Sequence, residues 1–308
     1  MNSHGAVSAL PANAADLRIG FIGAGRLGQA LAWSLTQANL NVVGVSSKGK
    51  EKAKVLADRI HACCCMEAQA LIDDCDLIFV TTPDSVIRQT CDGLSWRPGQ
   101  AVVHCSGVTE VDELNHAFMH GALIGGFHPM QTFGDPHAAV QSLPGCTITV
   151  EAVAPELMGL LLDLVERLHC AANRLPAGMR GRYHAAAGYT SQFINALFDQ
   201  ATRLWQTWGA TEEEALQALL PLARGTLSAI QSAGVARGMP GPVSRGDFSS
   251  IDKHLGAISP MGIEMLDFYR TVCAATVPLA QKAGGIDNVQ AQEFIELLAV
   301  EKVRSSNG

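Results

Sequence analysis

A glycine-rich turn near the start of the chain limits what this sequence can fold into more than any other feature. The turn follows an apolar segment, residues 17–22, and precedes a helical pattern at residues 27–37. In a GxGxxG turn the first glycine allows a tight bend, the second lets backbone amides approach a pyrophosphate, and the third lets the helix pack on the strand. An ordinary tight turn is the alternative. We predict a dinucleotide site at Gly23, Ala24, Gly25, Arg26, Leu27 and Gly28.

Strand and helix patterns alternate through the first half of the chain. Apolar runs at 17–22, 42–45, 77–80, 101–103, 123–124 and 146–150 are separated by helical patterns at 27–37, 51–60 and 85–94, and a further helix starts at Pro155. This alternation favours parallel strands joined by crossover helices. The predicted fold class is therefore α/β, with a doubly wound, mostly parallel Rossmann sheet.

The pattern changes in the second half, where helical periodicity occurs at 183–208, 212–232, 260–283 and 291–303 with no strand between. We predict a flexible tail at 1–16, a Rossmann domain at 17–177 and an all-helical domain at 178–308. The substrate cleft is expected between the two domains.

Composition excludes several function classes. A net charge of −7 without a dense Lys/Arg block argues against a nucleic-acid binder. No apolar run reaches the ~20 residues that a membrane-spanning helix needs. The nine cysteines lack paired spacing, so we expect reduced thiols and no metal site. A cytoplasmic protein with a small-molecule substrate is predicted.

The second strand indicates which dinucleotide is bound. NAD sites usually place Asp or Glu at its end, but here the chain reads Ser46-Ser47-Lys48. These residues accept a 2′-phosphate, and Arg26 offers a second cation, so NADP(H) is predicted; alternatively, Lys48 is a solvated loop charge. Thr81, Thr82 and Pro83 end another strand and should line the cofactor, unless they form only a capped turn.

Polar side chains after two further strands are candidates for the chemistry. His104 and Ser106 follow the run at 101–103, and His128 lies in the segment HPMQTF, predicted to be a loop. Transfer of a hydride to a carbonyl or imine requires a proton donor near the substrate heteroatom, and these residue types can serve. A structural role is the alternative for each histidine. Arg245, in a long irregular segment, is a candidate for binding an anionic substrate, or else it pairs with Asp247.

Several motifs together resemble a bacterial family of Rossmann-like proteins whose helical second half has no assigned function. They are the glycine turn, Ser106-Gly107, HPMQTF, the YHAAA segment that contains His184, GPVSRGD and His254-Leu255, over about residues 17–300. The resemblance implies an NADP oxidoreductase related to deazaflavin-dependent enzymes and pyrroline-5-carboxylate reductase, with a helical domain like the C-terminal domain of 6-phosphogluconate dehydrogenase. Prephenate dehydrogenases are more distantly similar. By analogy with them, His128 transfers the proton and Ser106 is its partner. His184, on a helical segment among alanines, is a candidate to face the cleft and bind the substrate, or else it has a structural role.

Two positions depart from the family pattern, which often has Lys and Asn where this chain has Arg180 and Gln192. Related hydroxyacid dehydrogenases use such a Lys/Asn pair in catalysis. Arginine, with a pKa above ~12, is no general acid at neutral pH but can clamp a carboxylate. Either the family lysine is not a catalyst, or this protein is impaired, or Arg180 anchors the substrate. We favour the last, with Gln192 also at the substrate.

The resulting prediction is an NADP(H)-dependent oxidoreductase for a small, anionic carbonyl, imine or alcohol. A catalytically silent NADP(H) sensor and a deazaflavin-dependent NADP reductase are the alternatives. The long helical pattern at 181–208 further predicts a homodimer formed through the helical domain.

Overall fold

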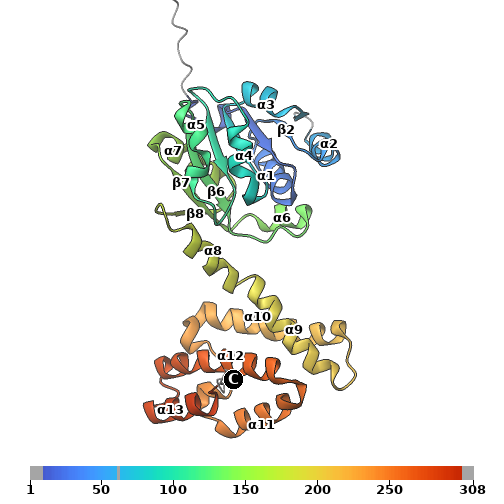
Figure 1. Cartoon of the computed structure of the whole chain (residues 1–308), viewed down its shortest axis with the longest axis vertical. Coiled ribbons are helices and arrows are strands. Elements are labelled where there is room, and N and C mark those ends of the chain that lie inside the picture. Colours follow the sequence, from blue (N-terminus) through green and yellow to red (C-terminus); the bar gives the residue numbers. More distant parts are fainter. Residues whose placement is uncertain (1–9, 61–62, 300–308) are drawn as a thin grey trace, which may run out of the picture. The chain divides into compact units, whose positions relative to one another are not determined.

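The computed structural model describes residues 10–60 and 63–299. The chain divides into two compact units, of which the first ends at Ser191 and the second begins at Gln192. The first unit contains the sheet, and the described part of the second contains only helices (Figure 1). The structure thus groups residues 178–191 with the sheet, beyond the boundary predicted at residue 177.

An eight-stranded sheet with the order β3-β2-β1-β4-β5-β6-β7-β8 forms the centre of the first unit. All neighbouring strands are parallel except β6 and β7, which are antiparallel. The predicted mostly parallel Rossmann sheet is therefore confirmed. The strands are β1 Ile19–Ile22, β2 Val42–Ser46, β3 Cys64–Cys65, β4 Leu77–Val80, β5 Ala101–His104, β6 Leu123–Pro129, β7 Thr147–Ala152 and β8 Ala171–Arg174.

The central strands are buried on both faces, which is why β1, β4 and β5 are almost continuously apolar in sequence. On one face, under α1 and α7, the rings of Phe21 and Phe79 stack, and the ring of Phe127 meets that of Phe79 edge to face. On the other face α3, α4 and α5 cover a second core. The helices of this unit are α1 Arg26–Gln37, α2 Lys50–Arg59, α3 Ala68–Asp74, α4 Ile87–Asp92, α5 Asn115–Met119, α6 Pro136–Ser142, α7 Pro155–Arg167 and α8 Arg180–Tyr189.

The second unit has its own apolar core, in which the rings of Phe248 and Phe294 stack with centroids 3.9 Å apart. Its described residues contain no strand, so the predicted all-helical domain is confirmed. None of the helices described in either unit is long and apolar enough to cross a bilayer. The helices of the second unit are α9 Gln192–Gln206, α10 Glu212–Arg237, α11 Phe248–Ile258, α12 Ile263–Ala283 and α13 Asn288–Leu297.

The predicted continuous helix at 183–208 is wrong, because the chain leaves the helical pattern between α8 and α9. The hydroxyls of Thr190 and Ser191 both donate hydrogen bonds to the carbonyl of Ala187, at 3.2 and 2.8 Å, and so compete with backbone bonding there. The predicted loop at HPMQTF is also wrong at its start, because His128 and Pro129 are the last residues of β6.

Both ends of the chain differ in part from the prediction. Ala14–Asp16 form a 3₁₀ turn, and Ala14 is fully buried, so this part of the predicted tail packs on the first unit. Residues 1–9 of that tail and residues 300–303 of the predicted last helix lie outside the described residues.

Candidate active site

The glycine turn lies at the carboxyl end of β1, and two of its glycines are required by packing. Gly23 has a φ of +113°, and a Cβ there would lie 2.7 Å from the carbonyl of Thr81. A Cβ on Gly28 would lie 2.4 Å from the carbonyl oxygen of Gly23. The Thr81 hydroxyl donates a 2.7 Å hydrogen bond to that same oxygen and fixes the turn on β4. Any side chain at either glycine would therefore displace backbone.

Gly25 is different, because nothing within the protein crowds it. The atom nearest to a Cβ there would be 4.0 Å away. Gly25 is the N-cap of α1, provides no side-chain cap, and is followed by no acidic residue in the first turn. The first amides of α1 are thus available to an anion, as the pyrophosphate of a dinucleotide requires.

A cavity of about 570 Å³ opens beside this turn. This volume is in the range of cofactor sites. The hydroxyl oxygen of Thr82 is buried there and has no partner among the described protein atoms, so a polar group is available to a ligand. The predicted residues that line the cavity are Gly23, Ala24, Gly25, Ser46, Ser47, Lys48, Thr81, Thr82 and Pro83.

Three predicted cofactor residues are not among those lining this cavity. Arg26 directs its guanidinium to the carbonyl of Gly134, at 3.4 Å, and Leu27 packs on the core. Gly28 packs against the carbonyl of Gly23 within the turn. Lys52, which sequence reasoning missed, lines the cavity together with Lys48. The available signal was its position four residues after Lys48, in the lysine-rich segment that follows β2.

A row of polar residues crosses the sheet at β6, β7 and β8. His128 is the register partner of Thr149, which in turn is the partner of Asn173. Directly opposed residues point to the same face, so all three side chains share one side of the sheet. Helix α8 lies against this region through its buried residues Arg180 and Tyr183, which are three apart and therefore on one helix face.

His128 and Tyr183 form the central pair of the candidate site. Nδ1 of His128 lies 2.7 Å from the hydroxyl oxygen of Tyr183, and the rings meet edge to face. Burial, with smaller contributions from the charges of His184 and Arg180, lowers the pKa of His128 to about 4. The imidazole is therefore neutral at physiological pH.

The other nitrogen of His128 faces Gly107, the residue after Ser106. A Cβ at Gly107 would lie 2.9 Å from Nε2 of His128 and 2.6 Å from Cδ2 of His184. Only glycine fits at this position, because any side chain would overlap both imidazoles. His184 is exposed, and its ring centroid lies 6.3 Å from that of His128.

Arg180 is fully buried, which corrects the prediction that it is open to a substrate carboxylate. Its Nε donates to Glu151 at 2.8 Å, and its Nη1 donates to the carbonyl of Ser106 at 2.7 Å. Its Nη2 lies so close to Gly126 that a Cβ there would overlap it. The guanidinium thus links β7 to the turn that follows β5, so Arg180 has a structural role in the candidate site.

His104 and Ser106 are also bonded within the protein rather than presented to a ligand. His104 is fully buried and accepts a 3.3 Å hydrogen bond at Nδ1 from the amide of Ser106. Burial, and then the charge of Arg180, lower the pKa of His104 to about 3. The Ser106 hydroxyl donates to Thr109 Oγ1 at 2.8 Å and accepts from the amides of Val108 and Thr109. The predicted pairing of Ser106 with His128 is not present, since that position is occupied by Tyr183.

The two remaining candidates belong to the second unit. Gln192 is the first residue of α9, and Arg245 ends a short 3₁₀ turn, Val243–Arg245. Asp247 caps α11 through Ser250, and no ion pair joins it to Arg245 within the described part of the chain. The charge of Arg245 nevertheless contributes, after the hydrogen bonds from Ser250, to lowering the pKa of Asp247.

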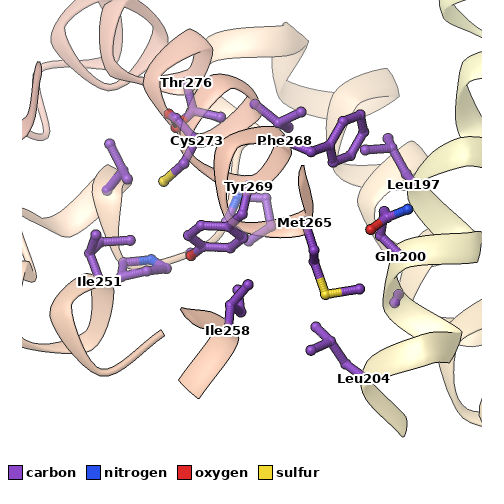
Figure 2. Close-up of a pocket in the computed structure, with 16 residues that line it drawn as sticks. Leu197, Gln200, Leu204, Ile251, Ile258, Met265, Phe268, Tyr269, Cys273 and Thr276 are labelled. Carbon is purple, nitrogen blue, oxygen red and sulfur yellow. Dashed lines mark hydrogen bonds between the residues drawn. The ribbon is translucent and has the colours of Figure 1, made fainter. Parts of the chain in front are cut away.

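An apolar groove of about 370 Å³ lies within the second unit. Figure 2 shows Leu197, Gln200 and Leu204 of α9 on one side of it and Met265, Phe268 and Tyr269 of α12 on the other. No group of three or more His, Cys, Asp or Glu side chains suited to a metal occurs among residues 10–60 and 63–299.

Sequence reasoning missed Tyr183, Thr149, Asn173 and Glu151 as parts of the site. The available signal was weak: Thr149 and Glu151 are polar residues at alternate positions of an otherwise apolar strand, and Tyr183 precedes the candidate His184. Alternation identifies a shared face but not what covers that face.

Comparison with known proteins gives two family matches. Residues 18–107 match the family described as NADP oxidoreductase, coenzyme F420-dependent. Residues 146–276 match a domain of unknown function, DUF2520. His104 and Ser106 fall in the first match, Tyr183 falls in the second, and His128 lies between them. No curated protein sequence matches the chain significantly.

Solved structures of similar fold agree with this organisation. A Bacteroides fragilis protein provisionally named an NADP oxidoreductase is 23% identical with a TM-score of 0.69, covering 86% of this chain and 100% of its own. A reductive aminase from Aspergillus terreus, in complex with NADPH4, cyclohexanone and allyl amine, is 17% identical with a TM-score of 0.60, covering 92% and 99%. Pyrroline carboxylate reductase from Plasmodium falciparum, with NADP bound, is 13% identical with a TM-score of 0.58, covering 90% and 99%. The chain therefore matches an NADP oxidoreductase domain over residues 18–107 and a DUF2520 domain over residues 146–276, and it shares its fold with these solved structures.

Proposed function

We propose that this protein is an NADP(H)-dependent oxidoreductase of a small carbonyl, imine or alcohol, in which His128 transfers the proton. The observation that carries the proposal is a neutral, tyrosine-bonded imidazole whose Nε2 lies against Gly107, in the turn that follows β5. His128 and Gly107 are at the same carboxyl edge of the parallel strands as the glycine turn and its cavity. In open α/β sheets, ligands bind at this edge.

NADP(H) is supported as the cofactor by two lysines at the end of β2. Lys48 and Lys52 line the cavity together with Ser46 and Ser47, and none of the residues that line it carries a carboxylate to repel a 2′-phosphate. NADPH, when bound, supplies a hydride to the substrate carbon. The residues of the chain hold the pyrophosphate on α1, select the 2′-phosphate and provide the proton.

Cofactor choice is tested by fluorescence titration with NADPH and NADH. We expect NADPH to bind more tightly and the difference to shrink in Lys48→Ala and Lys52→Ala. Lys54→Ala is the matched control, because Lys54 is on α2 but does not line the cavity. Tighter binding of NADH by the unchanged protein would contradict this part of the proposal.

The role of His128 is tested by His128→Asn with a panel of small keto acids, aldehydes, imines and alcohols. General acid catalysis contributes about 100-fold or more, so kcat should fall by that order while NADPH affinity is retained. His120→Asn, an exposed histidine on the same unit, is the control. Tight NADPH binding with no turnover on any substrate would instead favour the sensor.

A deazaflavin reductase is a second candidate, favoured by the description of the matched family as coenzyme F420-dependent. In that case NADPH would be oxidised by a purified deazaflavin without any other substrate. Absorbance measurements with and without the deazaflavin distinguish the two reactions.

The helical unit is proposed to form a homodimer in a cytoplasmic protein with reduced thiols. Leu197, Phe268 and Val272 rim its groove and are 37–44% exposed, which is unfavourable for an apolar cluster left in water. Sedimentation velocity at micromolar concentration should give a dimer, and Phe268→Glu should give a monomer. A monomer for the unchanged chain would contradict this. Substrate anchoring by Gln192 and Arg245 stays a prediction for the same unit.

A further inference from the structure

We propose that Cys146 and Cys170 are a modification site, at which a hydroperoxide forms an intramolecular disulfide that fastens β8 to the rest of the sheet. The inference goes beyond the proposed function and does not depend on it. It concerns two of the nine thiols of the chain, which stay reduced until such an oxidant is present.

The backbone holds the two cysteines opposite each other. They directly precede β7 and β8, which are parallel, and the residues that follow them, Thr147 and Ala171, are register partners. On one side of the pair the amide of Gly145 donates to the carbonyl of His169 at 2.8 Å. On the other side the amide of Ala171 donates to the carbonyl of Cys146 at 2.9 Å. Neighbouring strands are about 4.8 Å apart, which is within the Cα separation of ~4.4–6.8 Å that a disulfide spans.

The two sulfur atoms are already in contact. Sγ of Cys146 lies 3.8 Å from Sγ of Cys170, although the residues are 24 positions apart in the chain. A disulfide brings its sulfurs to ~2.0 Å, so rotation of the side chains can close the bond while the backbone stays in place. Both cysteines are partly exposed, so a small oxidant can reach them.

The surroundings of the pair indicate which thiol reacts first. Burial, then the thiolate charge and the hydrogen bond of Cys170, raise the pKa of Cys146 to about 12. Burial also raises the pKa of Cys170, but there the hydrogen bond with Cys146 acts in the opposite direction. Cys170 is therefore the attacking thiol and Cys146 the resolving one. Because burial disfavours both thiolates, the pair responds to sustained rather than brief exposure to the oxidant.

Oxidation by hydrogen peroxide balances in two steps. The Cys170 thiolate attacks one peroxide oxygen and the O–O bond breaks, which gives a sulfenic acid and a hydroxide that becomes water with the proton lost from Cys170. The sulfur of Cys146 then attacks that of Cys170 and the S–O bond breaks, so the hydroxyl leaves as a second water with the Cys146 proton. Two thiols are oxidised to one disulfide, and one peroxide is reduced to two waters. A dithiol reductant reverses the modification by exchange.

The disulfide acts on an edge strand. Among the described strands β8 pairs only with β7, and three of its four residues are exposed. The covalent link closes a loop that contains α7 and so constrains the unfolded chain. Oxidation should therefore hold β8 on the sheet more firmly than its backbone hydrogen bonds do alone.

The bond is detected by treating the full chain with hydrogen peroxide in a Cys64→Ser, Cys65→Ser background, which removes exposed thiols. Remaining free thiols are alkylated before digestion, and mass spectrometry should then find the peptide of Cys146 linked to that of Cys170. Cys146→Ser and Cys170→Ser should each abolish this product. Cys273→Ser, which removes a partly exposed thiol of the second unit, is the matched control and should retain it.

Hydrogen exchange measures the effect on β8. Its amides should exchange about 10-fold or more slowly after oxidation, and dithiothreitol should restore the original rate. In Cys146→Ser, peroxide should leave the rate unchanged. Alkylated thiols at both positions after prolonged oxidation, a sulfinic acid without a disulfide, or a disulfide to a different cysteine would overturn the proposal. A Cys146–Cys170 disulfide with unchanged exchange in β8 would overturn the fastening of that strand.

Discussion

Acid should destabilise the sheet unit through the buried imidazole of His104. The folded protein holds this ring with a pKa of about 3, whereas an exposed histidine titrates near 6.5. Between these values the unfolded chain binds a proton that the folded chain does not, so stability falls as pH decreases through 6.5. From pH 7 to pH 5 the loss from His104 alone is about 2 kcal/mol.

The assay is urea unfolding at a series of pH values, followed by circular dichroism. In His104→Asn the amide oxygen can replace Nδ1 as acceptor for the Ser106 amide but cannot be protonated in this range. The pH dependence of its free energy of unfolding should therefore be smaller than that of the unchanged protein by about 2 kcal/mol over this interval. His128 adds a loss of the same sign in both proteins. His120→Asn should retain the full dependence. If His104→Asn retains it as well, the assigned burial of a neutral imidazole is refuted.

Three substitutions test other contacts of this unit. Gly107→Ala should abolish most turnover, because the added methyl group would lie against Nε2 of His128. Gly159→Ala is the control, since no atom lies within 4 Å of a Cβ there, and it should keep its activity. Equal activities of the two variants would contradict the assignment. Glu151→Gln should lower the free energy of unfolding by about 3 kcal/mol, because it leaves the charge of Arg180 buried and unpaired, and a loss below ~1 kcal/mol in urea titrations would refute this. Gly28→Ala should weaken NADPH binding in a fluorescence titration, since its Cβ would displace the carbonyl of Gly23; unchanged affinity would show that the turn tolerates the shift.

The fold could be predicted well because its signals are local. The apolar runs of β1, β4 and β5 and the helical periodicity of α1 are properties of neighbouring residues. Their apolar side chains must be buried, so the local pattern is enough to predict each element. β3 and β8 were missed because two cysteines and a short segment of exposed residues carry no such pattern. The break between α8 and α9 was missed because the competing hydroxyls interrupt an otherwise helical sequence.

The cofactor cavity was also largely predictable. Gly23, Ser46 and Thr81 end adjacent parallel strands, so chain order and strand polarity alone place them at one edge. Arg26 was placed wrongly for the opposite reason. Its location in the glycine turn is local information, but the direction of its long side chain depends on the carbonyl of Gly134, more than a hundred residues later.

By itself, then, the sequence determined the sheet, the helical second unit, the glycine turn and the presence of His128 at a strand end. Only the tertiary structure decided which polar groups meet there. The register of β6, β7 and β8 aligns His128, Thr149 and Asn173, and the packing of α8 brings Tyr183 to the first of these and Arg180 into a buried ion pair. Hydrogen-bond partners and burial arise from contacts between distant segments, and a pattern of neighbouring residues does not encode them.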